Sequence, residues 1–284
     1  MDSQLSVKVA YQGVAGAYSE QALYQHFGEN IEAVPHRSFL GMFRALENHE
    51  VNRILLPVEN SFAGSVQQSY ELLLEHDFRI QAEVIFHVNH ALLVNPGTVF
   101  EDIQYVQSHP QALAQCERFI RRYKLQPIEG FDTAGSAKQL SEVPQKNLAV
   151  IASIRAAEIY ELQVLDTEIE DVSYNYTRFL VLGYEDADVG TYNKTSIVFA
   201  TRHKPAALYT CLGIFAKHNI NLTKVESRPR RNKPWEPVFY LDFEGHWKDD
   251  AVSQAMIELI QHSSFVKMLG SYPGVARDSL KMGI

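Results

Sequence analysis

The sequence predicts an α/β domain followed by a smaller α+β domain. Through residue 184, short apolar runs that suit strands alternate with segments of helical periodicity. This alternation is typical of a mostly parallel sheet with helices on its faces. Residues 194–274 follow the order βαββαβ instead, which is the order of a ferredoxin-like fold. The acidic segment 185–193 (EDADVGTYN) has no apolar periodicity, so we expect a linker between domains at 5–184 and 194–274.

The elements of the first domain follow from local periodicity. SVKVAY, RILLPV, YVQS, LAVIAS and FLVLG are runs typical of strands, and residues 78–88 (FRIQAEVIFHV) alternate apolar and polar residues as a long strand does. Apolar residues from Phe39 to Leu46 recur at i, i+3, i+4 and i+7, which predicts a helix. Pro110 suits the first position of another helix.

The second domain has the same kinds of signal in a different order. KTSIVFAT, INLTKVES, PVFYLDFEG and FVKMLGSY are predicted strands, and PAALYTCLGIFAKH and DAVSQAMIELIQ are predicted helices. There is no internal repeat between the two domains.

Composition narrows the class of partner. With 26 Lys and Arg against 34 Asp and Glu, the net charge of −8 argues against broad attraction to nucleic acid or to an anionic membrane. No uncharged apolar stretch is long enough to span a bilayer, and MDSQLSVKVAYQG does not resemble a signal peptide. Cys116 and Cys211 stand at apolar positions, as reduced core thiols do. We therefore expect a cytoplasmic protein.

Polar side chains gather at the ends of four predicted strands. In open α/β sheets, ligands bind beyond the carboxyl ends of the strands. Singly, Ser108 and Thr133 suit helix N-caps and Asn60 suits a turn, but together the residues predict a polar pocket. These residues are Glu59, Asn60, Ser61, Ser108, His109, Gln111, Gln115, Asp132, Thr133, Ser136, Asn175, Thr177 and Arg178.

The residue types in this set limit the chemistry. No cysteine nucleophile is among them, and the histidines are dispersed, with HVNH (87–90) inside a continuing strand pattern. Gly13 and Gly16 follow a strand, but the segment is neither GxGxxG nor a P-loop. Arg178 offers a bidentate fork for a carboxylate. We therefore expect no metal and no cofactor, and a small carboxylated substrate.

Six segments, in chain order, resemble the prephenate dehydratase family. They are YQGVAGAYSE (11–20), LPVENSFAGSV (56–66), SHPQALAQC (108–116), DTAGSA (132–137), IASIRAAE (151–158) and YTRF (176–179). Three further segments resemble the regulatory ACT domain of that family: KPAALY (204–209), ESRPRRNKPWEPVFYLDFEG (226–245) and KMLGSYP (267–273). Several segments also resemble the arogenate dehydratases of plants.

The resemblance implies a catalytic domain of two lobes, like a periplasmic binding protein, with the site in the cleft. It also implies loss of CO2 and water from prephenate to give phenylpyruvate, in L-phenylalanine biosynthesis. Two alternatives stay open: conversion of L-arogenate to L-phenylalanine, and a non-catalytic amino-acid sensor. We expect no fused chorismate mutase segment, because the dehydratase pattern begins within the first dozen residues.

The family's catalytic residues fall on matching positions of this chain. The resemblance implies that Thr177 hydrogen-bonds the leaving hydroxyl and helps to deliver its proton. Glu59 is either an acid or orienting group, or else a salt-bridged or capping carboxylate. Arg178 would hold the side-chain carboxylate of the substrate. The other residues implied are Asn60, Ser108 and Gln115 as catalytic, and Phe179, Ser61, His109, Thr133 and Ser136 as substrate-binding.

The ACT resemblance implies an effector site for L-phenylalanine. Its residues would be Ala206, Ala207, Leu208, Glu226, Ser227, Arg228 and Pro229. Ala206 stands where the family commonly has Gly, and Tyr209 stands where it has Val. Pairing of such domains implies at least a homodimer, and a tetramer is compatible. The basic run ESRPRRNKP, near Trp235, could alternatively bind RNA, although the net charge argues against it.

Overall fold

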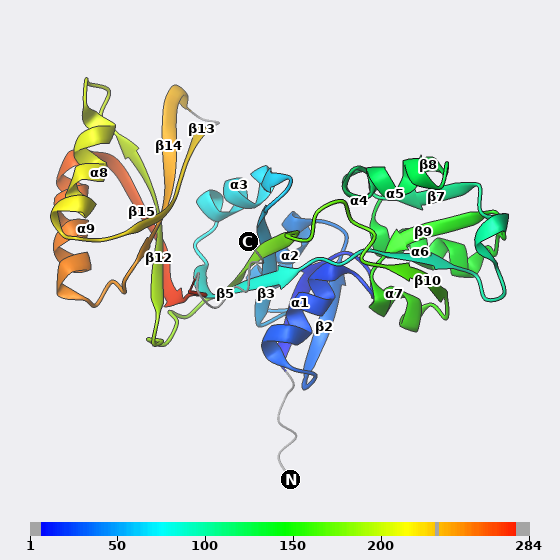
Figure 1. The fold of residues 1–284 in the computed structure, drawn as a ribbon. Coiled ribbons are helices and arrows are strands. Elements are labelled where there is room, and N and C mark those ends of the chain that lie inside the picture. The colour runs from blue at the N-terminus through cyan, green and yellow to red at the C-terminus, as the bar shows by residue number, and fades with distance from the viewer. Residues whose placement is uncertain (1–6, 231–232, 277–284) are drawn as a thin grey trace, which may run out of the picture. The chain divides into compact units, whose positions relative to one another are not determined.

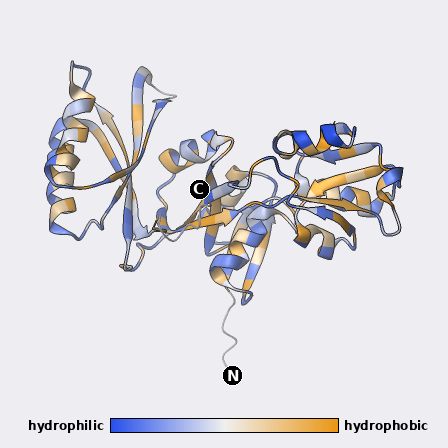
Figure 2. Cartoon of the chain, viewed as in Figure 1, coloured by the Kyte–Doolittle hydropathy of each residue, from blue (hydrophilic) through white to orange (hydrophobic). Residues whose placement is uncertain are grey.

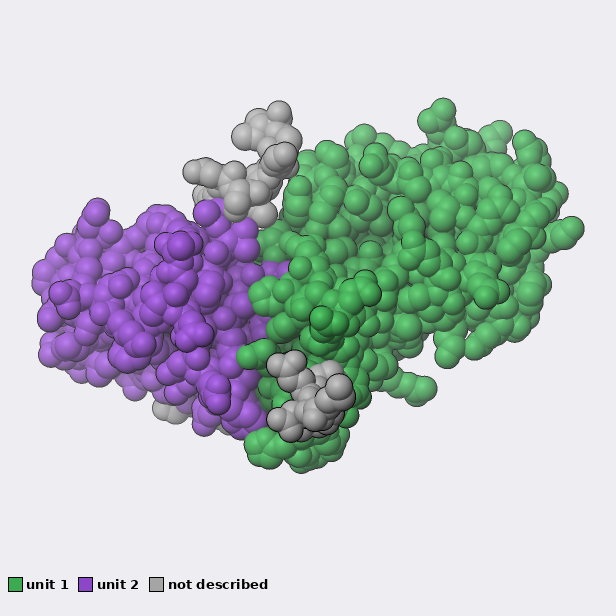
Figure 3. Space-filling model, turned by 90° about the horizontal axis from the view of Figure 1, so that it is seen from below, with its two compact units in different colours: residues 1–69, 85–179, 282–284 green, residues 70–84, 180–281 purple. Residues whose placement is uncertain are grey.

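The computed structural model describes residues 7–230 and 233–276, which form two compact units. Among the described residues, unit 1 comprises 7–69 and 85–179, and unit 2 comprises 70–84 and the chain from 180 onward. Figure 3 colours unit 1 green and unit 2 purple. The predicted domain limits at 184 and 194 remain a prediction, since the units are defined by compactness alone.

The first sheet has the strand order β2-β1-β3-β11-β5. Its strands are β1 (Val7–Gln12), β2 (Ile31–His36), β3 (Arg53–Asn60), β5 (Arg79–His87) and β11 (Tyr176–Gly183), and the short β4 (Gly64–Ser65) pairs with β3. The helices of this region are α1 (Tyr18–Phe27), α2 (Phe39–Glu47) and α3 (Gln67–Glu75). β1 pairs parallel to both β2 and β3, with Val9 opposite Ala33 and Arg53.

The helix predicted from Phe39 is confirmed as α2. Ser38 is its N-cap, and its Oγ accepts a hydrogen bond of 3.1 Å from the Gly41 amide. Met42, Phe43 and Leu46 are fully buried on one face of α2. The helical spacing of these apolar residues therefore places α2 against the core of the first sheet.

The second sheet lies wholly in unit 1 and has the order β10-β6-β9-β7-β8. Its strands are β6 (Ala91–Val94), β7 (Tyr105–Ser108), β8 (Gln126–Glu129), β9 (Leu148–Ala152) and β10 (Gln163–Thr167). The helices are η1 (Phe100–Asp102), α4 (Pro110–Gln115), α5 (Glu117–Arg122), α6 (Thr133–Glu142) and α7 (Ile154–Ile159). β7 is parallel to β8 and β9, whereas β6 is antiparallel to β9 and β10, so this sheet is mixed. Every residue of β9 is buried, and Figure 2 shows this strand as strongly hydrophobic.

Two stretches of chain pass between the first and second sheets, from β5 to β6 and from β10 to β11. The first differs from expectation: HVNH does not continue the strand, because β5 ends at His87 and β6 begins at Ala91. The Val88 amide donates to the Asn175 carbonyl at 2.8 Å, which ties the two crossing stretches together. The arrangement matches the predicted two lobes.

Unit 2 contains an antiparallel sheet of order β13-β14-β12-β15. The strands are β12 (Asn193–Thr201), β13 (Leu222–Arg230), β14 (Lys233–Glu244) and β15 (Ser263–Pro273), and the helices are α8 (Ala207–Lys217) and α9 (Asp250–His262). Figure 1 shows both helices on one face of this sheet. Most of their buried residues, with Phe199, Leu241 and Phe243, form one core. The predicted ferredoxin-like βαββαβ order is thus confirmed.

Both cysteines, Cys116 and Cys211, are free and buried, as expected of core thiols. Among the described residues, no helix is long and apolar enough to cross a membrane.

Candidate functional site

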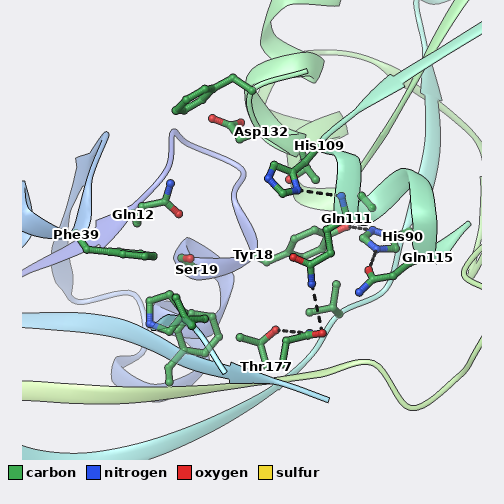
Figure 4. Close-up of a pocket in the computed structure, with 18 residues that line it drawn as sticks. Gln12, Tyr18, Ser19, Phe39, His90, His109, Gln111, Gln115, Asp132 and Thr177 are labelled. Carbon is green, nitrogen blue, oxygen red and sulfur yellow. Dashed lines mark hydrogen bonds between the residues drawn. The ribbon is translucent and has the colours of Figure 1, made fainter. Parts of the chain in front are cut away.

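A pocket of about 500 Å³ is lined by residues of unit 1 that come from the regions of the first and second sheets (Figure 4). Its volume is typical of small-molecule sites. The lining residues from the first sheet, its helices and its loops include Gln12, Tyr18, Ser19, Phe39, Asn60, Thr177 and Phe179. Those from the second sheet, its helices and loops, and the stretch that joins β5 to β6, include His90, His109, Gln111, Gln115, Phe131, Asp132 and Thr133.

Asn60 is the last residue of β3, and its side chain is held in one orientation. The backbone amides of Phe62 and Ala63 donate to Asn60 Oδ1 at 3.0 and 2.9 Å. Because a backbone N–H can only donate, Oδ1 must face these two groups and Nδ2 must face the other way. Asn60 Nδ2 then donates to Asn175 Oδ1 at 2.9 Å and to Thr177 Oγ1 at 3.1 Å.

The Thr177 hydroxyl is therefore an acceptor toward Asn60. The amide nitrogen of Asn60 has no lone pair to offer, so the Thr177 O–H proton must point elsewhere. Thr177 lies on β11 and lines the pocket, as does Phe179 two residues later on the same face. The hydroxyl proton is consequently available to a molecule in the pocket.

A second branch of hydrogen bonds leads from Asn175 across to the other lobe. Asn175 Nδ2 donates to Gln115 Oε1 at 3.0 Å, and His90 Nε2 lies 2.7 Å from the same oxygen. The Tyr18 hydroxyl lies 2.7 Å from His90 Nδ1. Asn175, Gln115 and His90 are 1%, 3% and 2% exposed. Burial lowers the pKa of His90, which keeps the imidazole neutral near pH 7.

The pocket brings together six of the eleven residues predicted for the catalytic site. Asn60, Gln115, His109, Thr133, Thr177 and Phe179 line it. Glu59, Ser61, Ser108, Ser136 and Arg178 are not among the lining residues. Alternation along β11 accounts for Arg178, whose side chain points to the opposite face from its neighbours Thr177 and Phe179.

Three of the serines outside the lining have structural partners. Ser108 Oγ donates to the Ile151 carbonyl at 2.6 Å, and Ser136 Oγ donates to the Asp132 carbonyl at 2.8 Å. Ser61 Oγ donates to the Tyr174 carbonyl at 2.7 Å. These hydroxyls satisfy backbone carbonyls near the pocket.

The N-caps differ by one residue from the prediction of Ser108 and Thr133. The caps are His109, whose Nδ1 accepts from the Gln111 amide at 3.2 Å, and Asp132, whose carboxylate accepts from the Gly135 amide. Thr133 is instead the first residue of α6. The N-cap is the residue just before the first helical residue, so its identity depends on where the helix begins. α4 begins one residue later than a cap at Ser108 requires, and α6 begins one residue earlier than a cap at Thr133 requires.

The sequence does not predict Tyr18 and His90 as site residues, although both line the pocket. His90 falls within a strand-like pattern, and Tyr18 falls in a segment marked chiefly by its glycines. The only sequence signal is a His at the end of a strand-like run, which is weak by itself.

Among the described residues, no group of three His, Cys, Asp or Glu could hold a metal ion. Asp132 is the only carboxylate among the residues that line the described pocket, and no Lys or Arg lines it. The polar part of the lining thus consists mainly of amides, hydroxyls and imidazoles.

The predicted effector residues lie in unit 2. Ala206 precedes α8 with φ 61°, a left-handed conformation in which glycine is favoured. Ala207 is buried, and Leu208 packs against the core of the unit. On β13, Glu226 forms ion pairs with Arg228 at 2.5 Å and with Lys224 at 3.1 Å, while Ser227 and Pro229 are exposed on the other face.

Comparison with known proteins agrees with this architecture. The family model "Prephenate dehydratase" matches residues 9–187. The arogenate dehydratase/prephenate dehydratase 2 of Arabidopsis thaliana is 44% identical over 278 residues, covering 94% of this chain and 73% of that protein.

Two solved structures superpose on nearly the whole chain. One is described as GqqA, a novel type of quorum quenching acylase, with a TM-score of 0.87 and 32% identity over 94% of this chain and 98% of that one. The other is the prephenate dehydratase of Arthrobacter aurescens in complex with L-Phe, with a TM-score of 0.87 and 27% identity over 94% and 89%. The chain belongs to the prephenate dehydratase family.

Proposed function

We propose that this enzyme converts prephenate to phenylpyruvate, or L-arogenate to L-phenylalanine, by decarboxylating dehydration in L-phenylalanine biosynthesis. The observation that carries the mechanism is the orientation of Thr177. Its oxygen accepts from Asn60, which leaves its proton for a ligand in the pocket. A dehydration needs such a donor at the leaving hydroxyl.

The reaction balances with one proton taken up by the leaving group. The bond from the ring to its carboxylate breaks, and CO2 leaves. That electron pair enters the ring, the double bonds shift, and the carbon–oxygen bond on the opposite side of the ring breaks. The departing hydroxyl takes a proton and leaves as water, while the ring becomes aromatic. No external oxidant or reductant is consumed.

Asn60 and Thr177 act together in this proposal. Asn60 orients Thr177, and the Thr177 O–H donates to the departing hydroxyl as negative charge develops on it. Gln115, His109, Thr133 and Phe179 would contact the substrate from the pocket wall. Glu59, Ser61, Ser108, Ser136 and Arg178 would hold the strand and helix ends that carry these residues.

We further propose that unit 2 binds L-phenylalanine as an effector. The support is the Arthrobacter aurescens structure with L-Phe bound and the match of residues 206–208 and 226–229 to the family's effector segments. The enzyme would work as a homodimer or tetramer of this chain. A cytoplasmic location is consistent with two buried free thiols.

The likeness to the acylase GqqA suggests a second candidate activity. Acyl transfer from an amide needs a nucleophile next to a base. Among the described residues, the pocket hydroxyls of Ser19, Thr133 and Thr177 have no hydrogen bond to a histidine. This arrangement favours dehydration over amide hydrolysis.

The test is turnover of prephenate and of L-arogenate, measured side by side at neutral pH with and without L-phenylalanine. We expect phenylpyruvate from prephenate or L-phenylalanine from arogenate, with the rate lowered by L-phenylalanine. A third assay would follow release of a carboxylic acid from N-acyl amides. Binding of L-phenylalanine without turnover of either cyclohexadiene would contradict the proposal and support the sensor alternative.

A further inference from the structure

One buried donor of the pocket wall has no partner. Gln115 is 3% exposed and lines the pocket, yet within the described residues its Nε2 has no hydrogen-bond partner. A buried unpaired donor destabilises the folded state, so such groups in folded proteins call for an explanation. Rotating the Gln115 carboxamide by half a turn would exchange its nitrogen and oxygen. This rotation could give Nε2 a partner only if the neighbouring groups could accept a hydrogen bond from it.

The groups around Gln115 do not permit its carboxamide to rotate in this way. The chain of hydrogen bonds starts at the backbone amides of Phe62 and Ala63, whose polarity is fixed because an amide nitrogen can only donate. That polarity passes through Asn60 to Asn175, whose Oδ1 accepts and whose Nδ2 must therefore donate to Gln115. The atom of Gln115 that meets Asn175 is thus the oxygen Oε1.

The other side of the network enforces the same orientation. His90 Nε2 lies 2.7 Å from Gln115 Oε1, so the neutral imidazole must carry its proton on Nε2. Nδ1 is then an acceptor, and the Tyr18 hydroxyl donates to it at 2.7 Å, with the Asn89 carbonyl as a longer second acceptor at 3.1 Å. Figure 4 shows Tyr18, His90 and Gln115 side by side at the pocket wall. Two donors therefore converge on Oε1, and Nε2 is left for the pocket.

We propose that Tyr18, His90 and Asn175 are positioning residues, which hold the Gln115 carboxamide with its Nε2–H directed at a carboxylate oxygen of the substrate. The inference rests on the proposed function for the identity of the ligand. An ionised carboxylate is suited to this place because it only accepts hydrogen bonds. It would give the orphaned donor its partner in a pocket whose described wall has no Lys or Arg.

Substitution of His90 gives the most direct test of this proposal. Two variants distinguish a role of His90 in positioning Gln115 from a role in packing and from a role as proton donor. The side-chain nitrogen of glutamine in His90→Gln can take the place of imidazole Nε2 and still donate to Gln115. His90→Leu has similar bulk but no donor. We expect kcat/KM of His90→Gln to stay within about fivefold of the unsubstituted enzyme, and that of His90→Leu to fall about 10–100-fold, as when a residue that supports a ligand group is lost.

Equal losses in both variants would overturn the proposal, since a packing role or a role for His90 as proton donor would make Gln no better than Leu. Full activity in both variants would also overturn it. Thermal unfolding of each variant shows whether the folded state is kept.

A second measurement does not depend on the substrate. In ¹⁵N spectra of histidine-labelled enzyme, with the His90 signal assigned by its loss in His90→Gln, we expect the tautomer protonated at Nε2. Tyr18→Phe, which removes only the hydroxyl, should introduce the Nδ1-protonated tautomer. An Nδ1-protonated His90 in the unsubstituted enzyme would refute the network even if the enzyme turns over prephenate. If it turns over neither substrate, the proposed function fails while the tautomer still decides the network.

Discussion

The pocket of unit 1 and the β13 face of unit 2 are both polar, but they are organised differently. At the pocket wall, Asn60, Asn175 and Gln115 form a chain of neutral amides, in which Asn60 donates to Asn175, Asn175 donates to Gln115, and the donor of Gln115 has no partner. On β13, Lys224, Glu226 and Arg228 form a charged cluster beside the Tyr70 ring. In a chain of neutral amides, the orientation of each amide fixes the orientation of the next. An ion pair depends on charge instead, and it tolerates rearrangement of the two side chains.

The largest effect is expected where the neutral chain begins. Asn60→Asp keeps the acceptor for the Phe62 and Ala63 amides but removes the donor to Thr177 and Asn175. The Thr177 proton would then turn toward the introduced carboxylate. We expect kcat to fall about 10³-fold, because a positioned donor to the transition state is lost. Steady-state kinetics would measure this, and a loss below tenfold would mean that orientation of Thr177 is unimportant.

The next effect concerns the end of the chain. Gln115→Glu keeps the two hydrogen bonds accepted from His90 and Asn175 but turns the pocket-facing donor into an acceptor. We expect kcat/KM to fall about 10²-fold, with the loss mostly in KM. Gln12→Glu, which adds the same charge at another lining residue, is the matched control and should cost less. Equal losses would indicate a general charge effect.

The reverse exchange at Glu226, in unit 2, should lower the stability of the fold. Lys224 contacts Glu226 Oε2 and Arg228 contacts Oε1, so Glu226→Gln removes the charge and leaves an acceptor oxygen for one of the two cations. Because Glu226 is partly exposed, we expect the free energy of unfolding to fall by about 1–2 kcal/mol. Urea denaturation would measure it. A loss above about 4 kcal/mol would show that this cluster depends on orientation as the pocket does.

The smallest effect is expected at the start of α8. Ala206 has φ 61°, where a Cβ is strained. Ala206→Gly should raise the free energy of unfolding by about 0.5–1 kcal/mol, since glycine adopts this backbone without strain but loses more entropy on folding. Denaturant midpoints would test this, and a destabilised variant would show that the alanine side chain contributes packing that offsets the strain.

Much of the fold could be predicted because it depends on local patterns. The alternation of strands and helices, the helix at Phe39 and the ferredoxin-like order follow from periodicity within single segments. The end of β5 at His87 could not be predicted, because the alternating pattern runs on to Val88 while the chain leaves the first sheet to reach the second.

The site could be predicted only in part. The sequence places Asn60 and Thr177 together, and alternation along β11 could also have separated Arg178 from them. The direction of each hydrogen bond could not be predicted, because it starts at the Phe62 and Ala63 amides and passes through residues far apart in sequence. Tyr18 and His90 could not be predicted as site residues for the same reason. Each acts through a residue that is distant in sequence and lies close to it only in the folded chain.

The central claim is that the Thr177 hydroxyl, oriented by Asn60, donates to the leaving hydroxyl. The most direct test compares Thr177→Val, which has the same shape without the hydroxyl, with Thr177→Ser, which keeps it. We expect kcat for dehydration to fall about 10²–10⁴-fold in Thr177→Val and far less in Thr177→Ser, with both variants folded. Near-normal turnover by Thr177→Val would contradict the account.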